Sequence, residues 1–536
     1  VLTGCSSAAP EDPPDTEEPA EALFELRVTE TRVPVLQGTS SSLTVEVVRK
    51  GTFEGAVALS ISGLPEGASI AAGAIEAGVG EVTLEVEAAE TAPHSLPTTV
   101  RITGTAEGTA DGAADGTAED TVDVTVTVCG HPGALDTSFA TGRVVVPVGA
   151  GEDYAHAAAV AANGKILLAG SAAENLGDFA LVRLERDGTI DTSFGEGGKV
   201  MTSLGSGSDV ARAIAIQKDG KIVVAGSSTG EGGADDFAVV RYLEDGSLDP
   251  SFGDEGQVVV PLSADADVAY AVLVQEDGKL VLGGSANQGS TTSGVDFALL
   301  RLNSDGSVDE EFGSEGSVLT PIASDAGTDA VYALTSQIVD GTEHLLAAGG
   351  EGDFALARYT SAGELDSSFG EGGVVRAVLG SVMGAARAVR LTETGHILAA
   401  GHKEHDFALV KFDASGDLVQ SFGQDGIVVT SVGETWDEAE GLAITEGGEI
   451  LVGGWAYEGS GSSGNFALVR YTEAGVLDPT FGDAGIVVTE VAPTGKSDQG
   501  HALVLQPDDR VPTVRVLLAG SSNDSNNDLA VTRFWL

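Results

Sequence analysis

The motif Leu-Asp-x-Ser-Phe-Gly recurs seven times, with some substitutions, along the last three quarters of the chain. Its phenylalanines are Phe139, Phe194, Phe252, Phe312, Phe369, Phe422 and Phe481, so successive copies are 55, 58, 60, 57, 53 and 59 residues apart. Self-similarity at such a period is the signature of an array of like units that bury their hydrophobic faces against one another. The motif therefore predicts seven copies of one structural unit.

A second motif, Asp-Phe-Ala-Leu-x-Arg, follows the same period. Its apolar anchors are Phe179, Phe237, Phe297, Phe354, Phe407, Phe466 and Leu529. In the second repeat the pattern predicts four strands, at residues 211–217, 221–225, 237–242 and 257–261. Strands such as Ile222-Val-Val-Ala are apolar on both faces and must be covered on both sides. Seven four-stranded sheets stacked face to face describe an all-β, seven-bladed β-propeller.

The order of the strands predicts how the array closes. The region begins with a strand at 144–147, which in other repeats is the fourth strand, and ends with a strand at 529–534, which elsewhere is the third. We expect these two strands to pair and to complete the seventh blade from both ends of the region. Such pairing would remove two open sheet edges in one step.

The two motifs and their sevenfold recurrence resemble the bacterial delta-60 repeat family, which is common in large surface and secreted proteins. The resemblance runs from Leu135 to the end of the sequence. Departures from the motifs are Lys411, Val419, Asn465 and Leu529. The resemblance implies the propeller fold and brings no established activity, cofactor or catalytic residue.

The first 21 residues predict a membrane anchor and a tether. Val1-Leu-Thr-Gly-Cys5 resembles the lipobox of bacterial lipoproteins, a family in which the peptidase cuts before the cysteine and that cysteine is acylated. We expect the sequence to start inside its own signal peptide and Cys5 to carry the lipid. Residues 6–21 are acidic and Pro-rich, as in a solvated tether. The predicted location is the outer membrane or cell surface, with membrane contact only through Cys5.

Residues 22–128 predict a β-sandwich of about seven short strands. Segments such as 43–48, 82–86 and 122–128 largely alternate between apolar and polar residues, which is typical of half-buried strands. The order of features resembles bacterial immunoglobulin-like (Ig-like) modules, which are usually spacers; ligand binding by this module stays open. Residues 108–120 are acidic and of low complexity and are expected to form a solvated loop. The predicted domains are therefore 1–21, 22–128 and 129–536.

The charge balance excludes one class of partner. The chain has 27 Lys+Arg against 82 Asp+Glu, a net charge of −55, whereas phosphate recognition needs clustered cations. Nucleic acid is therefore excluded as a ligand. The 42% of hydrophobic residues nevertheless supports a packed core, and two cysteines cannot form a disulfide framework.

Polar residues that recur in nearly every repeat are interpreted as structural. The arginines of the second motif are Arg183, Arg241, Arg301, Arg358, Arg470 and Arg533, and the aspartates of the first are Asp136, Asp191, Asp249, Asp309, Asp366 and Asp478. We expect them to form ion pairs or turn bridges within or between blades. Another aspartate precedes the opening strand of six blades: Asp153, Asp209, Asp267, Asp329, Asp437 and Asp498. Hydrogen bonding at the strand start is expected there, and Ca²⁺ binding remains the alternative.

Three residues after that aspartate, the repeats diverge. The equivalent positions hold His156, Arg212, Tyr270, Tyr332, Arg387, Glu440 and His501, which we call the variable ring. Equivalent positions with different side chains are how a propeller would shape a unique pocket at its axis, so these seven residues are the predicted ligand-binding site. Packing between blades by long amphipathic side chains is the alternative.

Other polar groups carry less weight. His402-Lys-Glu-His405-Asp406 has metal-ligand residue types but poor spacing for zinc, and an exposed polar loop is expected there. Cys129 is expected to be a buried thiol. The sequence contains no Gly-x-Ser-x-Gly elbow, phosphate loop or dinucleotide fingerprint.

The predicted function is that of an extracytoplasmic, lipid-anchored binding or interaction scaffold that presents its propeller to a protein or glycan ligand. The alternative is a propeller enzyme, a hydrolase or lyase, with an axial active site. No catalytic residue, metal ligand or cofactor is predicted, and the protein is expected to be a monomer.

Overall fold

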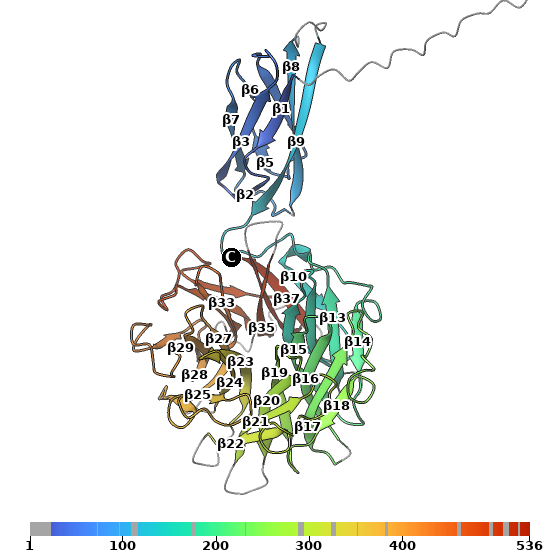
Figure 1. The fold of residues 1–536 in the computed structure, drawn as a ribbon, viewed down its shortest axis with the longest axis vertical. Coiled ribbons are helices and arrows are strands. Elements are labelled where there is room, and N and C mark those ends of the chain that lie inside the picture. The colour runs from blue at the N-terminus through green and yellow to red at the C-terminus, as the bar shows by residue number, and fades with distance from the viewer. Residues whose placement is uncertain are drawn as a thin grey trace, which may run out of the picture. The chain divides into compact units, whose positions relative to one another are not determined.

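The computed structural model describes residues 23–536, except residues 72, 96, 109–115, 174–176, 231, 288–293, 323–328, 351, 381–383, 458–462, 492–496, 508–513 and 524–525. The chain divides into two compact units, of which the first ends at Cys129 and the second begins at Gly130. Both units are built from strands (Figure 1). Within the described part of the chain, no helix has the length and apolar character that crossing a membrane would require.

The first unit consists of two sheets around one hydrophobic core. One sheet has the order β1 (Phe24–Val28), β3 (Ser40–Arg49), β7 (Glu81–Ala88) and β5 (Ala68–Ile70). The other has the order β2 (Arg32–Leu36), β9 (Gly116–Cys129), β8 (Thr98–Gly108), β4 (Val57–Ser62) and β6 (Ala74–Ile75). Alternating residues of these strands face inward, among them Val45, Val86, Val100 and Val126, all fully buried. Period-two patterning thus places one face of each sheet in the core.

The prediction that the acidic, low-complexity segment of this unit forms a loop is partly wrong. Strand β9 already begins at Gly116, and Gly116–Asp120 pairs with Gly104–Gly108 of β8. These residues are ordered as a strand because the β8–β9 ladder continues through them. In addition, the Asp120 carboxylate accepts a long-range hydrogen bond from the Leu26 backbone N–H at 2.6 Å. The described residues hold nine strands in this unit, against about seven expected, because the short strands β5 and β6 had no clear pattern in the sequence.

The second unit contains, among its described residues, seven four-stranded sheets. Six of them take their strands in chain order from the inside outward. They are β11 (Asp153–Val160), β12 (Ile166–Ala172), β13 (Asp178–Leu184), β14 (Lys199–Thr202); β15 (Asp209–Ile216), β16 (Ile222–Thr229), β17 (Asp235–Tyr242), β18 (Gln257–Val260); β19 (Asp267–Val274), β20 (Leu280–Asn287), β21 (Val295–Leu302), β22 (Ser317–Thr320); β23 (Val331–Val339), β24 (Thr342–Gly349), β25 (Phe354–Tyr359), β26 (Val374–Ala377); β27 (Gly384–Leu391), β28 (Ile397–Lys403), β29 (Asp406–Phe412), β30 (Ile427–Thr430); and β31 (Asp437–Ile444), β32 (Ile450–Tyr457), β33 (Gly464–Tyr471), β34 (Ile486–Thr489).

The remaining sheet joins strands from both ends of the unit. Its order is β10 (Arg143–Val146), β37 (Asn527–Trp535), β36 (Arg515–Asn523) and β35 (Asp498–Gln506). Strand β10 is antiparallel to β37, with Val144 opposite Val531 and Val146 opposite Leu529. The outermost position of this sheet is therefore filled by a strand that lies more than 350 residues earlier in the chain than its neighbours.

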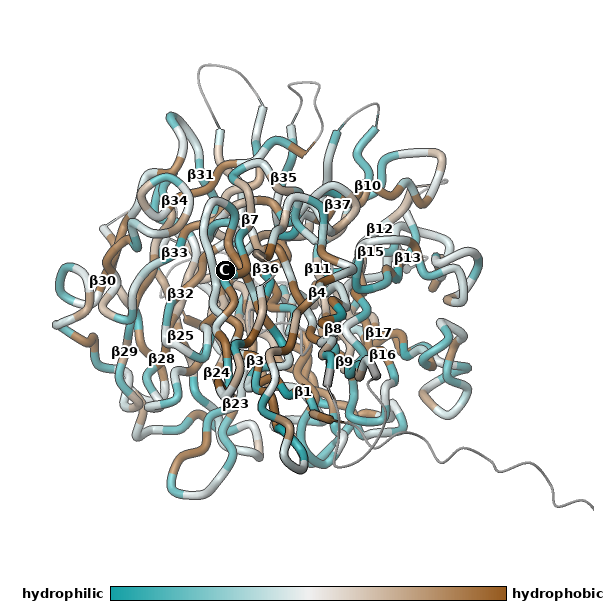
Figure 2. Tube along the Cα trace, turned by 90° about the horizontal axis from the view of Figure 1, so that it is seen from above, coloured by the Kyte–Doolittle hydropathy of each residue, from teal (hydrophilic) through white to brown (hydrophobic). Residues whose placement is uncertain are grey.

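The first strands of the sheets lie together at the middle of the unit. Each contacts the first strand of the next sheet, from β11 through β15, β19, β23, β27 and β31 to β35, and β35 contacts β11. In Figure 1 the labels β15, β19 and β23 lie toward the middle and β14, β18 and β22 toward the outside. Figure 2 shows the strands hydrophobic along much of their length, with hydrophilic residues at the outer turns.

The hydrophobic clusters of this unit lie between neighbouring sheets and contain side chains from both. One cluster, for example, combines Phe179 and Phe194 of the first sheet with Val224 and Tyr242 of the second. Phe194 is fully buried, as are the equivalent phenylalanines of the other sheets except Phe422, which is 2% exposed. The repeated aromatic residues are thus the contact between one sheet and the next.

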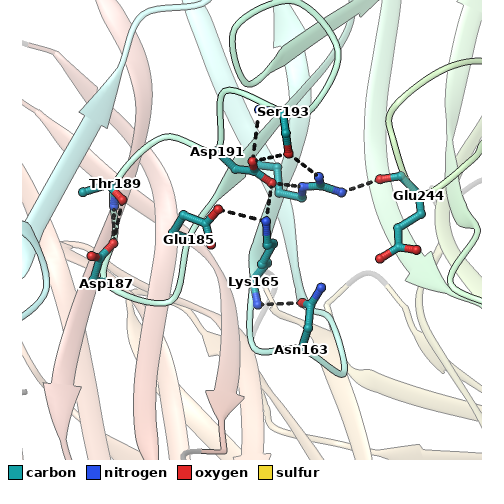
Figure 3. Close-up of polar contacts among 9 residues, drawn as sticks. Asn163, Lys165, Glu185, Asp187, Thr189, Asp191, Ser193 and Glu244 are labelled. Atoms are coloured by element: carbon teal, nitrogen blue, oxygen red, sulfur yellow. Dashed lines mark hydrogen bonds and ion pairs between the residues drawn. The ribbon is translucent and has the colours of Figure 1, made fainter. Parts of the chain in front are cut away.

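The expectation of a structural ion pair is confirmed in six sheets. The Arg–Asp distances are 2.6 Å for Arg183–Asp191, 2.8 Å for Arg241–Asp249, 2.6 Å for Arg301–Asp309, 2.8 Å for Arg358–Asp366, 2.9 Å for Arg470–Asp478 and 2.9 Å for Arg533–Asp136. In the first sheet Asp191 also receives Lys165 and the Ser193 hydroxyl (Figure 3). Each of the six guanidinium groups lies over the phenylalanine of the adjacent motif at 4.4–4.7 Å.

These arginines also connect one sheet to the next. Arg241 donates to the Ser304 carbonyl at 2.6 Å, Arg358 to the Ala414 carbonyl at 2.7 Å, and Arg183 to the Glu244 carbonyl (Figure 3). One side chain therefore holds its own turn, its own phenylalanine and the neighbouring sheet. A network that recurs in most of the repeats has a structural role.

Candidate axial pocket

The structure brings the seven residues of the variable ring together. His156, Arg212, Tyr270, Tyr332, Arg387, Glu440 and His501 all line one cavity of about 190 Å³, which we call the axial pocket. Each comes from the first strand of a different sheet, and each is half-buried. The other lining residues are mostly small or apolar, such as Ala157, Ala213 and Ala271. The polar character of the pocket therefore comes mainly from the ring.

Every ring residue sits at the same irregularity of its strand. The register between the first and second strands shifts between Ala211 and Ala213, so that Arg212 has no partner across the ladder. The same shift falls at His156, Tyr270, Tyr332, Arg387, Glu440 and His501. An extra residue of this kind is a β-bulge, which re-aims a side chain and often lies beside a functional site. The seven bulges direct seven side chains toward one centre.

A glycine on the neighbouring strand makes room for each bulge. A Cβ at Gly226 would overlap the carbonyl oxygen of Val210, two residues before Arg212. The equivalent glycines of the other sheets are Gly170, Gly284, Gly349, Gly401, Gly454 and Gly520, each against the matching backbone carbonyl. The last glycine of the Val-Ala-Gly segment is thus a requirement of the bulge. This glycine was the signal in the sequence by which the bulges could have been found.

Four ring residues form a continuous row of cation–π and aromatic contacts along one side of the pocket. The Arg212 guanidinium lies 5.1 Å from the centroid of the Tyr270 ring. The Tyr270 and Tyr332 centroids are 5.0 Å apart, and the Arg387 guanidinium lies 4.0 Å from the Tyr332 centroid. Cation–π contacts of this kind contribute about 0.5–2 kcal/mol each and hold the guanidinium planes in place.

The other side of the pocket is formed by an acid and two imidazoles. Arg387 Nε is 3.9 Å from Glu440 Oε1, and Glu440 also shares a hydrogen bond with Glu438. The His156 and His501 rings are 5.5 Å apart between centroids. Ring residues thus contact one another between sheets, as the packing alternative expects, and at the same time line a cavity.

Burial decides the charge of the titratable ring residues. Burial raises the pKa of Glu440 to about 7, with Glu438 acting in the same direction against the opposing effect of Arg387. Burial lowers the pKa of His156 to about 3, and His501 and Arg212 add to this. Burial likewise lowers the pKa of His501 to about 4. At neutral pH both imidazoles are therefore uncharged and Glu440 is only partly ionised.

The two ring arginines have hydrogen-bonding capacity to spare. In the described structure, the Nε atoms of Arg212 and Arg387 are buried and have no hydrogen-bond partner. A buried donor without an acceptor costs free energy, typically about 1–3 kcal/mol. The pocket therefore contains unsatisfied cationic donors that an acceptor group would satisfy.

A second cavity of about 370 Å³ continues from the pocket along the same strands. It is lined by Val160, Leu391, Ile444, Leu505 and other apolar residues, together with Arg390, which borders both cavities. Polar recognition along the inner strands is therefore concentrated in the variable ring.

The aspartates that open the first strands bind backbone, as expected. Asp153 accepts hydrogen bonds from the N–H groups of Val148 and Gly149 at 2.7 and 2.9 Å, and Asp437 does so from Val432 and Gly433 at the same distances. Asp209, Asp267 and Asp498 make equivalent contacts. Across the described ranges, no group of three or more His, Cys, Asp or Glu side chains is arranged to hold a metal ion.

The expectation of an exposed loop at the His-Lys-Glu-His-Asp cluster holds only for Glu404 and His405, because Lys403 ends β28 and Asp406 begins β29. His402 lies within β28 and is only 7% exposed, because the second-strand pattern continues through it. The His405 ring packs against the Trp436 ring at a tilt, with the ring centroids 4.2 Å apart. Cys129 is buried as expected, at 2% exposure. Cys5, the predicted lipid-anchor residue, lies outside the described residues.

A protein-family model described as "Domain of unknown function (DUF5122) beta-propeller" matches five segments of the second unit. They are residues 161–194, 217–252, 275–312, 339–369 and 448–481, which together make up less than half of the chain. Each segment ends at the phenylalanine of the first motif. The chain is thus an all-β protein with β-propeller repeats.

The search of curated proteins found no match. Among solved structures, "Structure of surface layer protein SbsC, domains 4-9" is 13% identical, and the alignment covers 95% of this chain and 82% of that one. Its TM-score is 0.14, at which the similarity carries no argument about fold or function.

Proposed function

We propose that the second unit is a closed seven-bladed propeller and that the first is an Ig-like spacer. Closure is supported by the antiparallel pairing of β10 with β37 and by the unbroken cycle of contacts among the seven first strands. The spacer is supported by the two-sheet sandwich around a single core. Among the described residues of the first unit, no buried side-chain donor or acceptor lacks a partner in the way that those of Arg212 and Arg387 do.

The protein functions as a binding scaffold whose ligand enters the axial pocket. The observation that carries this function is that seven different side chains occupy seven equivalent bulges around one cavity. A purely structural position would repeat one residue type, as the Arg–Asp pairs do. A small-molecule site is usually a concave pocket on which a few polar groups converge.

The location of this scaffold is extracytoplasmic, with the lipid on Cys5 as its anchor. Support comes from the lipobox-like Val1–Cys5 and from the acidic, Pro-rich residues that follow it. Mass spectrometry of the N-terminal peptide from the native host tests the anchor. Acylated Cys5 at the mature N-terminus is expected, and an unmodified cysteine would contradict it.

One observation favours the enzyme alternative. Glu440 has its pKa raised to about 7, which suits a general acid or base at neutral pH. Glycosidase carboxyl pairs, however, are about 5–9.5 Å apart, whereas Glu440 and Glu438 are within hydrogen-bonding distance. Binding is therefore the function we propose, and hydrolysis would require a partner other than Glu438.

A substitution that fills the pocket tests the binding function. The full chain is screened on an array of glycans and small solutes, beside variants Ala213→Phe and Ala264→Phe. Ala213 lines the pocket, whereas Ala264 is exposed and outside it. Binding is expected for the parent and for A264F, and loss for A213F with unchanged circular dichroism. Ligand binding that survives A213F would overturn the pocket as the site. Release of product from a bound glycan, abolished in Glu440→Gln, would instead favour the enzyme.

A further inference from the structure

The axial pocket is cationic within a strongly acidic chain. The protein has 82 acidic residues against 27 basic ones, yet the described residues lining the pocket include Arg212, Arg387 and Arg390 and only one carboxylate, Glu440. That carboxylate is half neutral near pH 7, since its pKa is about 7. Buried arginines are costly to desolvate. The ion pair of Arg387 with Glu440 is long, at 3.9 Å between Nε and Oε1, and is weakened further because Glu440 is only partly ionised.

We propose that the ligand of the axial pocket is a small hydroxylated carboxylate, such as a terminal hexuronic acid of a glycan. The proposal rests on the proposed function, that this pocket binds a ligand, and it names the chemical class of that ligand. Two properties of the variable ring support the proposal: the arginines are suited to bind an oxyanion, and the remaining side chains are suited to bind hydroxyl groups.

The arginines are prepared for a planar oxyanion. The Arg212 guanidinium lies 5.1 Å from the Tyr270 ring centroid, and the Arg387 guanidinium lies 4.0 Å from the Tyr332 ring centroid. The Nε donors of both arginines have no partner within the described chain. A guanidinium presents a rigid fork of donors that matches the two oxygens of a carboxylate. A carboxylate between these side chains would supply the acceptors that the protein itself does not.

The other ring residues match hydroxyl groups. The neutral imidazoles of His156 and His501, the Tyr270 and Tyr332 hydroxyls and the partly protonated Glu440 can each both donate and accept hydrogen bonds. A hydroxyl group has the same double capacity, whereas a simple inorganic anion only accepts. The cavity of about 190 Å³ is more than a lone carboxylate fills and leaves room for the hydroxyl-bearing part of a ligand.

Binding of such an anion is expected to favour the protonated form of Glu440. Glu440 on β31 faces Arg387 of β27 and lies beside Glu438 of its own strand and His501 of β35. A carboxylate ligand near Arg387 competes with ionised Glu440 for the same cation. The histidines stay neutral between pH 6 and 8, so Glu440 dominates the pH response in that interval.

Calorimetric titration of the full chain tests the proposal with four probes: glucuronate, glucose, acetate and inorganic phosphate. Glucuronate is expected to bind at least about tenfold more tightly than the other three. Its affinity is expected to rise several-fold from pH 8 to pH 6, and this rise is expected to disappear in Glu440→Gln.

Matched arginine variants locate the contact. Arg212→Gln and Arg387→Gln are each expected to weaken glucuronate binding by about tenfold to hundredfold, the usual range for a hydrogen bond to a charged group. Arg143→Gln is the control, because its Nε is also buried without a partner but belongs to the outer strand β10. Where a glutamine variant fails to fold, Arg212→Lys keeps the charge and removes the planar fork, and the comparison of the four probes needs no variant.

Three results would overturn the proposal. Equal affinity for glucose and glucuronate would show that the carboxylate is not recognised. Acetate or phosphate binding as tightly as glucuronate would show that the hydroxyl groups are not recognised. Binding of none of the four probes would exclude this ligand class. In that last case a ligand found on the array and lost in A213F would leave the pocket function standing, so the two failures are distinguishable.

Discussion

Arg241 Nε donates to Asp249 Oδ2 at 2.8 Å, and the two side chains are only 5% and 4% exposed. Asp249 also accepts from the Ser251 hydroxyl, while Arg241 reaches the Ser304 carbonyl of the next sheet. These contacts hold the pKa of Asp249 far below its usual range despite the opposing effect of burial. The same Arg–Asp pair recurs in most sheets, so each copy is expected to stabilise its part of the second unit.

Breaking this pair is expected to be costly. Asp249→Asn leaves the Arg241 charge buried without its counter-ion, and removing one partner of a buried pair typically costs about 3–5 kcal/mol. The control is Glu276→Gln, which removes the exposed ion pair of Glu276 with Lys218, side chains that are 81% and 78% exposed. Such a pair contributes about 0–1 kcal/mol. Urea unfolding of both variants measures the difference, and similar losses would contradict a structural role for the buried pair.

The glycine opposite each bulge is expected to be intolerant of a side chain. Gly226→Ala would place a Cβ against the Val210 carbonyl, forcing β15 and β16 apart near Arg212. We expect a loss of about 2 kcal/mol or more in unfolding free energy, together with weakened ligand binding. Gly232→Ala is the control, because nothing lies within 4 Å of a Cβ there. Equal stability of the two variants would show that the bulge can relax at no cost.

Glu440 is expected to make the protein less stable as pH rises. Its pKa is about 7 in the folded chain against 4.5 as the reference, so between these values the unfolded chain has lost a proton that the folded chain retains. The stability associated with this group is therefore present below pH 4.5 and declines up to pH 7, by at most about 3 kcal/mol at 1.36 kcal/mol per pKa unit.

Comparison with Glu440→Gln isolates this effect. Unfolding free energies of the parent and the variant are measured at pH 5 and pH 8. The parent is expected to lose more stability over that interval, because the opposing contributions of His156 and His501 are present in both proteins. Parallel pH profiles would show that Glu440 titrates normally.

Closure of the second unit can be tested by a cross-link. Val144 and Val531 are opposite one another in the β10–β37 ladder, where paired Cα atoms are about 4.5–5.5 Å apart, within disulfide range. Val144→Cys with Val531→Cys is expected to oxidise to a disulfide that stabilises by up to about 5 kcal/mol. Peptide mass mapping detects the link.

A register control accompanies the cross-link. In Val145→Cys with Val531→Cys the two side chains belong to opposite faces of the sheet, since neighbouring residues of a strand alternate. No link is expected there, and the native cysteines are common to both proteins. Equal cross-linking of the two pairs, or none in either, would contradict the pairing of the ends.

Much of the fold can be read from the repeats. The four strands expected in the second repeat correspond to β15, β16, β17 and β18 within a few residues at each end. Period and apolar patterning are local properties, so they define strand positions directly. The paired residues 116–120 of β9 and the buried His402 were misjudged because tertiary pairing extended strands through polar residues.

Local patterns in the chain are enough to predict the repeated unit, its strands, the recurring ion pair and the equivalence of the seven variable positions. The folded structure shows that these positions are bulges that direct their side chains to one pocket. A one-residue register shift leaves no mark on the strand that contains it; its sign in the sequence is the glycine on the neighbouring strand. The convergence of the seven side chains depends on how the sheets are arranged. The state of those side chains was also decided there. His156 and His501 are 345 residues apart in sequence, yet their rings lie 5.5 Å apart, and burial among other strands keeps both uncharged. Desolvation depends on what surrounds a group in space, which a local sequence pattern does not contain.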